Sequence, residues 1–160
     1  MPNPVTADAF VYSTYIFTTP QQVWRALTSG EATKQYFFGR RIESTWKIGA
    51  PITFWTAEGE KDVYGEVLEC EPSRRLSYTF RHPDDTNQRK RPTRATFEIR
   101  QMGPIVKLTL THRDLIPEDF ESNPDVFQGL NNGWPAILSN LKTYLETGKA
   151  FAFPGPNGAK

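Results

Sequence analysis

Hydrophobic and polar residues alternate through most of the chain between residues 40 and 115, in short runs separated by glycine, proline and aspartate. A period of two is the pattern of a strand with one buried face. The pattern predicts six strands, at residues 40–49, 52–57, 62–70, 76–81, 93–101 and 105–115, with a long polar loop at 82–92. A run rich in aromatic and β-branched residues, Phe10 to Phe17, predicts one further strand near the start.

Two short helices are expected between the first strand and the alternating region. Thr19 is placed to cap the first helix, Pro20 suits its first position, and Gln22 completes a capping box. Gly30 is expected to end this helix. The second helix is expected over residues 31–39, closed by its terminal glycine.

A long helix is expected from Gly133 to Gly148, because apolar residues recur there with the helical period. Its apolar stripe consists of Trp134, Ile137, Leu138, Leu141 and Leu145. Ser139, Asn140, Lys142 and Thr143 are expected mostly on the opposite side. The sequence therefore predicts an amphipathic helix that buries one face.

Successive strands with short connections predict one antiparallel sheet, since parallel neighbours need long crossovers. Such a sheet curls, so the last helix is expected across its concave side, with a cavity between them unless large side chains fill it. Alternation points these residues towards the helix: Ile52, Phe54, Gly65, Val67, Leu76, Tyr78, Phe80, Ala95, Phe97, Ile99, Val106, Leu108, Leu110 and His112. It also turns Glu69 inward or to the rim.

Composition narrows the class of protein. The chain of 160 residues predicts a single domain over 1–150 with a flexible Pro/Gly-rich tail at 151–160. A net charge of +1 argues against a nucleic-acid partner. There is no apolar run of about 20 residues to span a membrane and no secretory signal. The single cysteine, Cys70, fits a reducing compartment, so we expect a cytoplasmic monomer or homodimer.

The chain resembles the START-like (SRPBCC, helix-grip) superfamily, and within it the activator of heat-shock protein 90 ATPase homologues. The resemblance rests on TTPQQVWRALTS, YFFG, WKIGAPITF, GEVLECEPSRRLSYTF, LTLTH and GWPAILSNLKTYLETG, in the family's order. It implies an α+β helix-grip fold, in which a curved antiparallel sheet of about seven strands wraps around a long C-terminal helix. Two short helices follow the first strand. It also implies a deep cavity, and many relatives in the superfamily bind lipids, sterols or polyketides. The chaperone activity belongs to larger proteins with an additional N-terminal domain and is not carried over.

Candidate chemistry is sparse. His112 is the one histidine expected to face the cavity, where it could act as an acid or base or simply bond to a nearby polar group. His82 is expected in solvent. Two distant histidines and one cysteine do not form a metal-ligand set, and there is no phosphate-binding loop or nucleophile elbow. We therefore expect no metal, no cofactor and no catalytic residue.

Other charged and reactive groups have structural interpretations. Cys70 is interpreted as a structural thiol. Glu66 and Glu69 have opposite parity on one strand, so they cannot form a catalytic pair, and Glu98 is expected to face outward. Basic residues gather around the long loop: Arg81, Arg89, Lys90, Arg91 and Arg94. The loop also holds Asp84 and Asp85 and lacks interleaved aromatic residues, so it is interpreted as solvated.

The aromatic residues point to a hydrophobic ligand, although the same rings could simply fill the core. The predicted ligand-binding residues are Phe37, Phe54, Tyr78, Phe80, Phe97, Leu108, Leu110, His112, Trp134, Leu138 and Leu141. Tyr78 and His112 would supply polar contacts to a hydrophobic or amphipathic small molecule. One alternative is a cyclase- or hydrolase-like enzyme acting on an aromatic or polyketide-like substrate. Another is a stress-related, co-chaperone-like partner protein.

Overall fold

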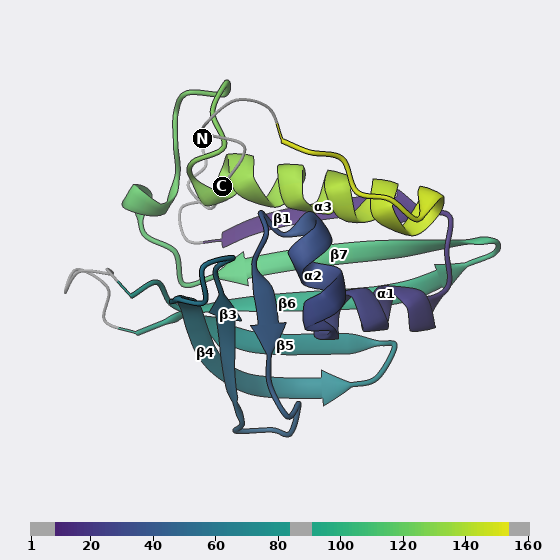
Figure 1. Cartoon of the computed structure of the whole chain (residues 1–160), viewed down its shortest axis with the longest axis horizontal. Coiled ribbons are helices and arrows are strands. Elements are labelled where there is room, and N and C mark those ends of the chain that lie inside the picture. Colours follow the sequence, from purple (N-terminus) through teal and green to yellow (C-terminus); the bar gives the residue numbers. More distant parts are fainter. Residues whose placement is uncertain (1–8, 84–90, 154–160) are drawn as a thin grey trace.

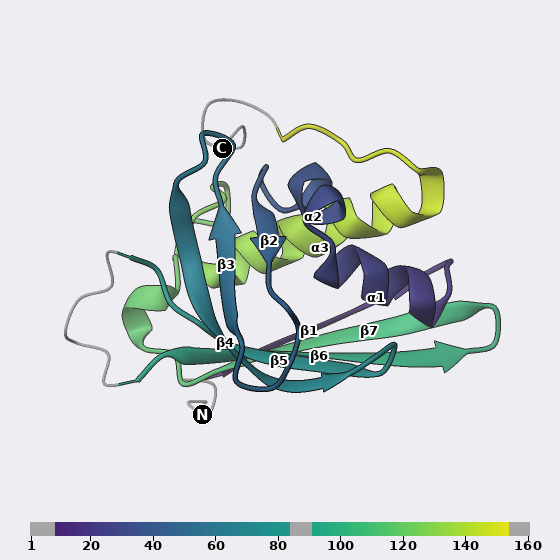
Figure 2. The ribbon, with the colours of Figure 1, turned by 60° about the horizontal axis from the view of Figure 1, so that its bottom comes forward.

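The computed structural model describes residues 9–83 and 91–153. A curved antiparallel sheet of seven strands, in the order β1-β7-β6-β5-β4-β3-β2, wraps around one long helix (Figures 1 and 2). The strands are β1 (Ala9–Ile16), β2 (Arg41–Glu43), β3 (Pro51–Trp55), β4 (Lys61–Glu71), β5 (Arg75–Phe80), β6 (Thr93–Met102) and β7 (Ile105–Arg113). The helices are α1 (Pro20–Thr28), α2 (Gly30–Tyr36), the short 3-10 helix η2 (Pro117–Asp119) and α3 (Leu130–Thr147). This is the helix-grip fold that the sequence predicts.

Alternation correctly assigns most inward-facing side chains. Leu76 and Tyr78 on β5, Phe97 on β6 and Leu108 on β7 are buried beneath α3. On β3, Phe54 is buried, while the indole Nε1 of Trp55 donates to Glu43 Oε1 at 2.7 Å on the outer side. The choice between these two adjacent aromatic residues is therefore confirmed.

The first turn of α1 follows its capping signal. Thr19 Oγ1 accepts a hydrogen bond from the N–H of Gln22 at 3.2 Å, and Pro20 is the first residue of α1. The sequence predicts that Gly30 ends α1, but α1 ends at Thr28 and Gly30 is the first residue of α2. A Cβ atom there would lie 2.7 Å from the carbonyl oxygen of Ile42, so the glycine permits close approach of β2.

Two strands differ from the expected pattern. The strand expected at 40–49 is limited to Arg41–Glu43, and Trp46 further on adopts a left-handed backbone conformation. In β4 the register with β5 shifts between Val67 and Glu69. This bulge turns Glu69 to the outer face, where Arg75 Nε donates to its carboxylate at 2.6 Å. The expectation that Glu69 lies inward or at the rim is therefore wrong.

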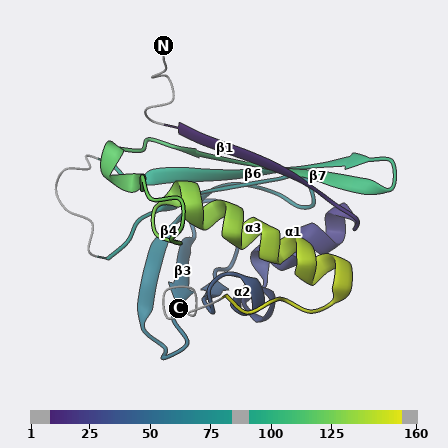
Figure 3. The ribbon, with the colours of Figure 1, turned by 90° about the horizontal axis from the view of Figure 1, so that it is seen from above.

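Helix α3 begins three residues earlier than expected, with Gly129 at its N-cap, and ends at Gly148 in the left-handed conformation (Figure 3). Its predicted stripe faces the sheet. Asn140, expected on the polar side, is instead buried, because the chain after α3 turns back along the helix and covers it. None of the helices in the described part of the chain combines the length and apolarity needed to cross a membrane.

Candidate ligand-binding pocket

The space between the sheet and the middle of α3 is filled. Its walls are Leu27, Thr33, Tyr36, Phe37, Phe54, Tyr78, Phe97, Trp134, Ile137 and Leu138. The remaining gap does not admit a water molecule. Phe54 lies with its ring centroid 4.8 Å from that of Phe37 and 6.4 Å from that of Tyr78, so aromatic rings occupy the space that a deep cavity would need.

A pocket of about 470 Å³ lies at one end of the same layer, beside the first turns of α3. The segment 115–130 and the adjoining ends of β4 to β7 complete it. Its apolar walls are Phe37, Phe38, Val63, Phe80, Leu115, Phe127, Leu130, Trp134 and Ile137. Its polar walls are Arg40, Asp62, His82, Thr93, His112, Glu118, Asp119 and Gln128.

The predicted site residues divide between these two regions. Phe80 and His112 line the pocket, and Phe37 and Trp134 line both the pocket and the filled centre. Phe54, Tyr78, Phe97 and Leu138 line the filled centre. Leu108, Leu110 and Leu141 are fully buried in the core and line neither region. The structure therefore does not bring the predicted residues together around one cavity, and their part in ligand binding stays a prediction.

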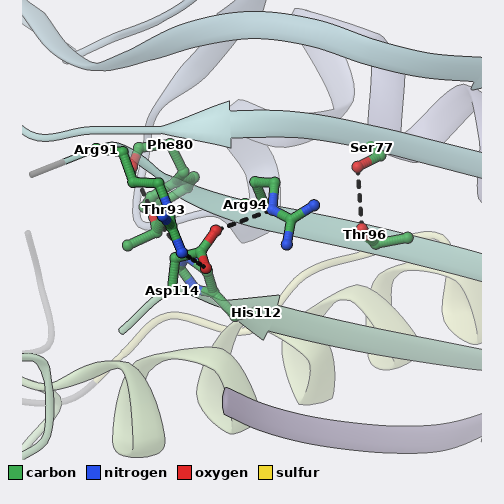
Figure 4. Close-up of polar contacts among 8 residues, drawn as sticks. All are labelled: Ser77, Phe80, Arg91, Thr93, Arg94, Thr96, His112 and Asp114. Carbon is green, nitrogen blue, oxygen red and sulfur yellow. Dashed lines mark hydrogen bonds and ion pairs between the residues drawn. The ribbon is translucent and has the colours of Figure 1, made fainter. Parts of the chain in front are cut away.

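A chain of hydrogen bonds runs along the pocket floor. The indole Nε1 of Trp134 donates to His112 Nδ1 at 2.9 Å. His112 Nε2 lies 2.7 Å from Thr93 Oγ1, which in turn donates to the carbonyl oxygen of Phe80 at 2.7 Å (Figure 4). An indole nitrogen only donates, so Nδ1 must be the acceptor and the imidazole proton sits on Nε2. Trp134, His112 and Thr93 thus form one directed chain.

These hydrogen bonds argue for a structural role of His112. Both ring nitrogens bond to protein groups, so neither is directed at a substrate. Tyr78 is not adjacent: His112 pairs with Ala95 and Ala95 with Tyr78, which places the two residues two strands, about 10 Å, apart. Burial also raises the pKa of the Tyr78 hydroxyl, which keeps it protonated. The geometry does not form the acid–base pair that the enzyme hypothesis requires.

The polar end of the pocket is formed by an ion pair between the α2–β2 connection and β4. Arg40 Nε pairs with Asp62, and Arg40 Nη1 donates to the carbonyl oxygen of Phe38 at 3.1 Å. His82 Nδ1 lies 3.9 Å from the other Asp62 oxygen, and its ring meets Phe80 edge-on. His82 is largely exposed, as expected, but it lies at the rim of the pocket, which the sequence did not indicate.

Sequence reasoning missed the wall formed by segment 115–130. This wall is held by Asn131, whose side chain bonds both backbone groups of Glu121 at 2.9 Å. Gly129 has a positive φ of 82°, and a Cβ atom there would lie 2.7 Å from the Glu121 nitrogen. Gly129 followed by paired asparagines was the available signal, because Gly and Asn are typical of such turns.

A second asparagine clamp holds the chain after α3. Asn140 Nδ2 donates to the carbonyl oxygen of Phe151 at 3.0 Å, and the N–H of Phe151 donates to Asn140 Oδ1 at 2.8 Å. Phe153 packs on Phe38 and Phe127, with centroid distances of 4.5 and 5.3 Å. The tail expected at 151–160 thus contacts the pocket wall through Phe153, and 154–160 lie outside the described residues.

Two arginines at the end of the basic loop and the start of β6 bind one carboxylate, that of Asp114. Asp114, with a positive φ of 66°, accepts from Arg91 Nη2 at 3.0 Å and from Arg94 Nε at 2.9 Å (Figure 4). The hydrogen bond from Arg91 is the largest of the effects that lower the pKa of the Asp114 carboxyl. Asp84, Asp85, Arg89 and Lys90 lie outside the described residues, so their assignment to a solvated loop stays a prediction.

Replacing Asp114 with asparagine is expected to lower the free energy of unfolding at pH 7 by about 1 kcal/mol. The folded-state pKa lies below the ordinary value of 3.8, so the carboxylate stabilises the fold above that pH, and this contribution disappears as the pH falls through the folded-state pKa. Asparagine also tolerates the left-handed backbone, so the substitution removes the charge without adding backbone strain. Urea unfolding at pH 7 and pH 3 should show the difference narrowing in acid. Asp125→Asn is the control, and an Asp114→Asn difference equal at both pH values would contradict the assignment.

The sheet wrapped around α3, with two short helices after β1, defines a helix-grip protein of the START-like class. The chain matches the family model "Activator of Hsp90 ATPase homolog 1-like protein" over residues 18–146 and therefore belongs to that family. The resemblance found in the sequence is confirmed.

Solved structures share this fold. The Aha1 dimer from Colwellia psychrerythraea has a TM-score of 0.68 and 20% identity, covering 89% of this chain and 98% of that one. An HSP90 activator from Plasmodium falciparum has a TM-score of 0.67 and 21% identity, covering 87% and 96%. CalU16 from Micromonospora echinospora has a TM-score of 0.66 and 17% identity, covering 92% and 77%. No curated protein matches the sequence. At these identities the likeness establishes the fold.

Among the described residues, no three His, Cys, Asp or Glu side chains are grouped so that they could hold a metal ion. Cys70 lies partly buried on β4, and burial raises the pKa of its thiol, which favours the unreactive protonated form. The pocket therefore offers aromatic surface, an ion pair and a few amide and carboxylate groups as its chemistry.

Proposed function

We propose that the protein binds a hydrophobic or amphipathic small molecule in the pocket at the N-terminal end of α3. The observation that carries this proposal is the contrast between a filled centre and an aromatic-walled space of about 470 Å³ beside it. That volume falls within the range of about 300–1,000 Å³ typical of small-molecule sites. A well-packed protein of this size has few large voids unless they serve a purpose.

The wall chemistry favours a ligand with a flat apolar body and one polar end. Phe37 and Trp134 meet edge-to-face with centroids 5.6 Å apart, and Phe80 lies 5.7 Å from Trp134. Such rings form slots that suit planar or branched apolar groups. At the opposite side, the Arg40–Asp62 pair offers both a donor and an acceptor to a polar substituent.

A protein partner is a second candidate, and the edge strand β1 favours it. Val11, Tyr15 and Phe17 are 61%, 46% and 69% exposed along this strand and its end. An edge strand with apolar side chains is a common surface for pairing with another chain. The family is described as activators of the Hsp90 ATPase, and the structural relative from Plasmodium falciparum is an HSP90 activator, which supports a partner role of the co-chaperone type. Co-purification of a polypeptide in native mass spectra would favour this candidate.

Filling the pocket from the helix should abolish ligand uptake. Gly133 is buried on α3 and lines the pocket, and a Cβ atom there would meet only the Phe127 carbonyl oxygen, at 3.5 Å. Gly133→Leu should therefore occupy the space, whereas Gly133→Ala adds a single methyl group. We expect the fluorescent probe 1-anilinonaphthalene-8-sulfonate to bind Gly133→Leu at least tenfold more weakly than Gly133→Ala.

The matched pair keeps this test interpretable. Both variants should give the circular dichroism spectrum of the unchanged protein, since both raise helix propensity at that position. Native mass spectrometry should show any co-purified mass on the unchanged protein and on Gly133→Ala, but not on Gly133→Leu. Equal probe affinity of the two folded variants would refute the pocket. A bulky residue at Leu138 would instead overpack the filled centre and test only stability.

A further inference from the structure

A groove of about 610 Å³ lies on the outer face of the sheet, on the side turned away from α3. Its lining residues extend from the turn between β4 and β5 to the hairpin of β6 and β7, and Figure 2 shows where these strands lie in the sheet. Its charged walls are Arg74, Arg75, Arg100, Lys107, Glu71 and Glu98. Cations therefore outnumber anions in a concave part of a surface that is otherwise mixed in charge.

Arg75 is already neutralised by its neighbours. Its Nε donates to Glu69 at 2.6 Å and its Nη1 to Glu98 at 2.5 Å. These bonds also occupy Glu98, the only acidic side chain of the groove that faces it from β6. Only Glu71 is left to balance the other cations in the groove.

Arg100 and Lys107 face each other directly across β6 and β7. Like charges in directly opposite positions on one sheet face repel, because their Cβ atoms are only about 5 Å apart. Lys107 Nζ lies 5.8 Å from the Tyr15 ring centroid, which provides partial compensation. Within residues 9–83 and 91–153, no carboxylate lies within ion-pair distance of Arg74, Arg100 or Lys107.

We infer that this groove binds a phosphate or pyrophosphate group of a small molecule. Guanidinium groups bind such oxyanions through paired hydrogen bonds, and an ammonium group adds a compact charge. An anion between Arg100 and Lys107 would remove their repulsion, and Arg74 extends the cationic wall towards the β4–β5 turn. The inference is independent of the ligand pocket, which lies on the opposite face of the sheet.

Calorimetric titration with inorganic pyrophosphate tests the groove. We expect the double variant Arg100→Gln, Lys107→Gln to weaken pyrophosphate binding at least tenfold relative to the unchanged protein. Arg25→Gln, which removes an exposed cation from α1 on the other side of the sheet, should leave the affinity unchanged. The double variant should fold normally, because it removes two like charges that face each other. A dissociation constant within threefold of the unchanged protein would overturn the inference.

Vesicles distinguish a soluble ligand from a lipid headgroup. Phosphatidylcholine vesicles containing phosphatidic acid should leave the protein in the supernatant if the phosphate belongs to a soluble molecule. Sedimentation of the unchanged protein, and not of the double variant, would assign the same oxyanion site to a lipid. If the protein binds neither pyrophosphate nor these vesicles, the proposed site is overturned.

Discussion

Replacing Gly65 with alanine is expected to lower the free energy of unfolding by about 3–5 kcal/mol. A Cβ atom at this position would lie 1.9 Å from the carbonyl oxygen of Thr79 and 2.6 Å from its carbonyl carbon. Both are backbone atoms, so no side-chain rotation can relieve the overlap. Strand β4 must move away from β5, and the hydrogen bond from the Glu66 N–H to Thr79 Oγ1, 2.8 Å long, is lost with it.

Urea unfolding of Gly65→Ala beside Gly133→Ala provides the matched comparison. Gly133 lies within α3, where its Cβ would make an ordinary contact at 3.5 Å, so alanine there should stabilise the fold by about 0.5–1 kcal/mol. The same chemical change should thus act in opposite directions at the two sites. A loss below about 1 kcal/mol at Gly65 would mean that the two strands are farther apart than described.

Gly65 also marks the limit of what the sequence pattern reveals. Alternation identifies β4 and its buried face correctly up to Val67. It carries no information on how closely two backbones approach or where a register shifts, since these depend on the pairing of strands distant in sequence. The outward turn of Glu69 follows directly from such a shift. The strands were predictable from local periodicity, but the bulge was not.

The position of the candidate site was less predictable than the fold. Phe37, Phe80, His112 and Trp134 belong to regular elements or their ends, and the sequence identified them as pocket residues. The opposite wall comes from segment 115–130, which has no period and is held by single amide contacts such as that of Asn131. Whether Phe54 and its neighbours would leave or fill a cavity depends on the packing of rings in three dimensions, which a linear pattern does not encode.

The burial of Asn140 illustrates the same limit on α3. A polar residue between apolar stripe positions indicates a solvent-facing side, yet Asn140 replaces water with the two backbone groups of Phe151. Asn131 repeats this arrangement with Glu121 at the other end of the helix. Helix α3 therefore organises the irregular segments on both sides of it, and these segments, rather than the sheet alone, delimit the pocket.

The hydrogen bond between Trp134 and His112 is expected to contribute measurably to stability. His112→Leu should lower the free energy of unfolding by about 3 kcal/mol, because it leaves the buried indole N–H without its acceptor and removes the bond to Thr93. Trp134→Phe should lower it by about 2–3 kcal/mol, because it leaves His112 Nδ1 without its donor and replaces the indole with a smaller ring. In the double variant neither orphaned group remains, so its cost should be about 1–2 kcal/mol less than the sum.

A parallel cycle with Trp24→Phe, on α1, is the control and should be additive with His112→Leu within about 0.5 kcal/mol. Nitrogen NMR shifts of His112 at pH 7 should report the Nε2-protonated tautomer, since Nδ1 accepts the indole proton. Additive costs for His112 and Trp134, together with an Nδ1-protonated ring, would contradict the directed chain. That result would also remove the evidence that both ring nitrogens of His112 are held by protein groups.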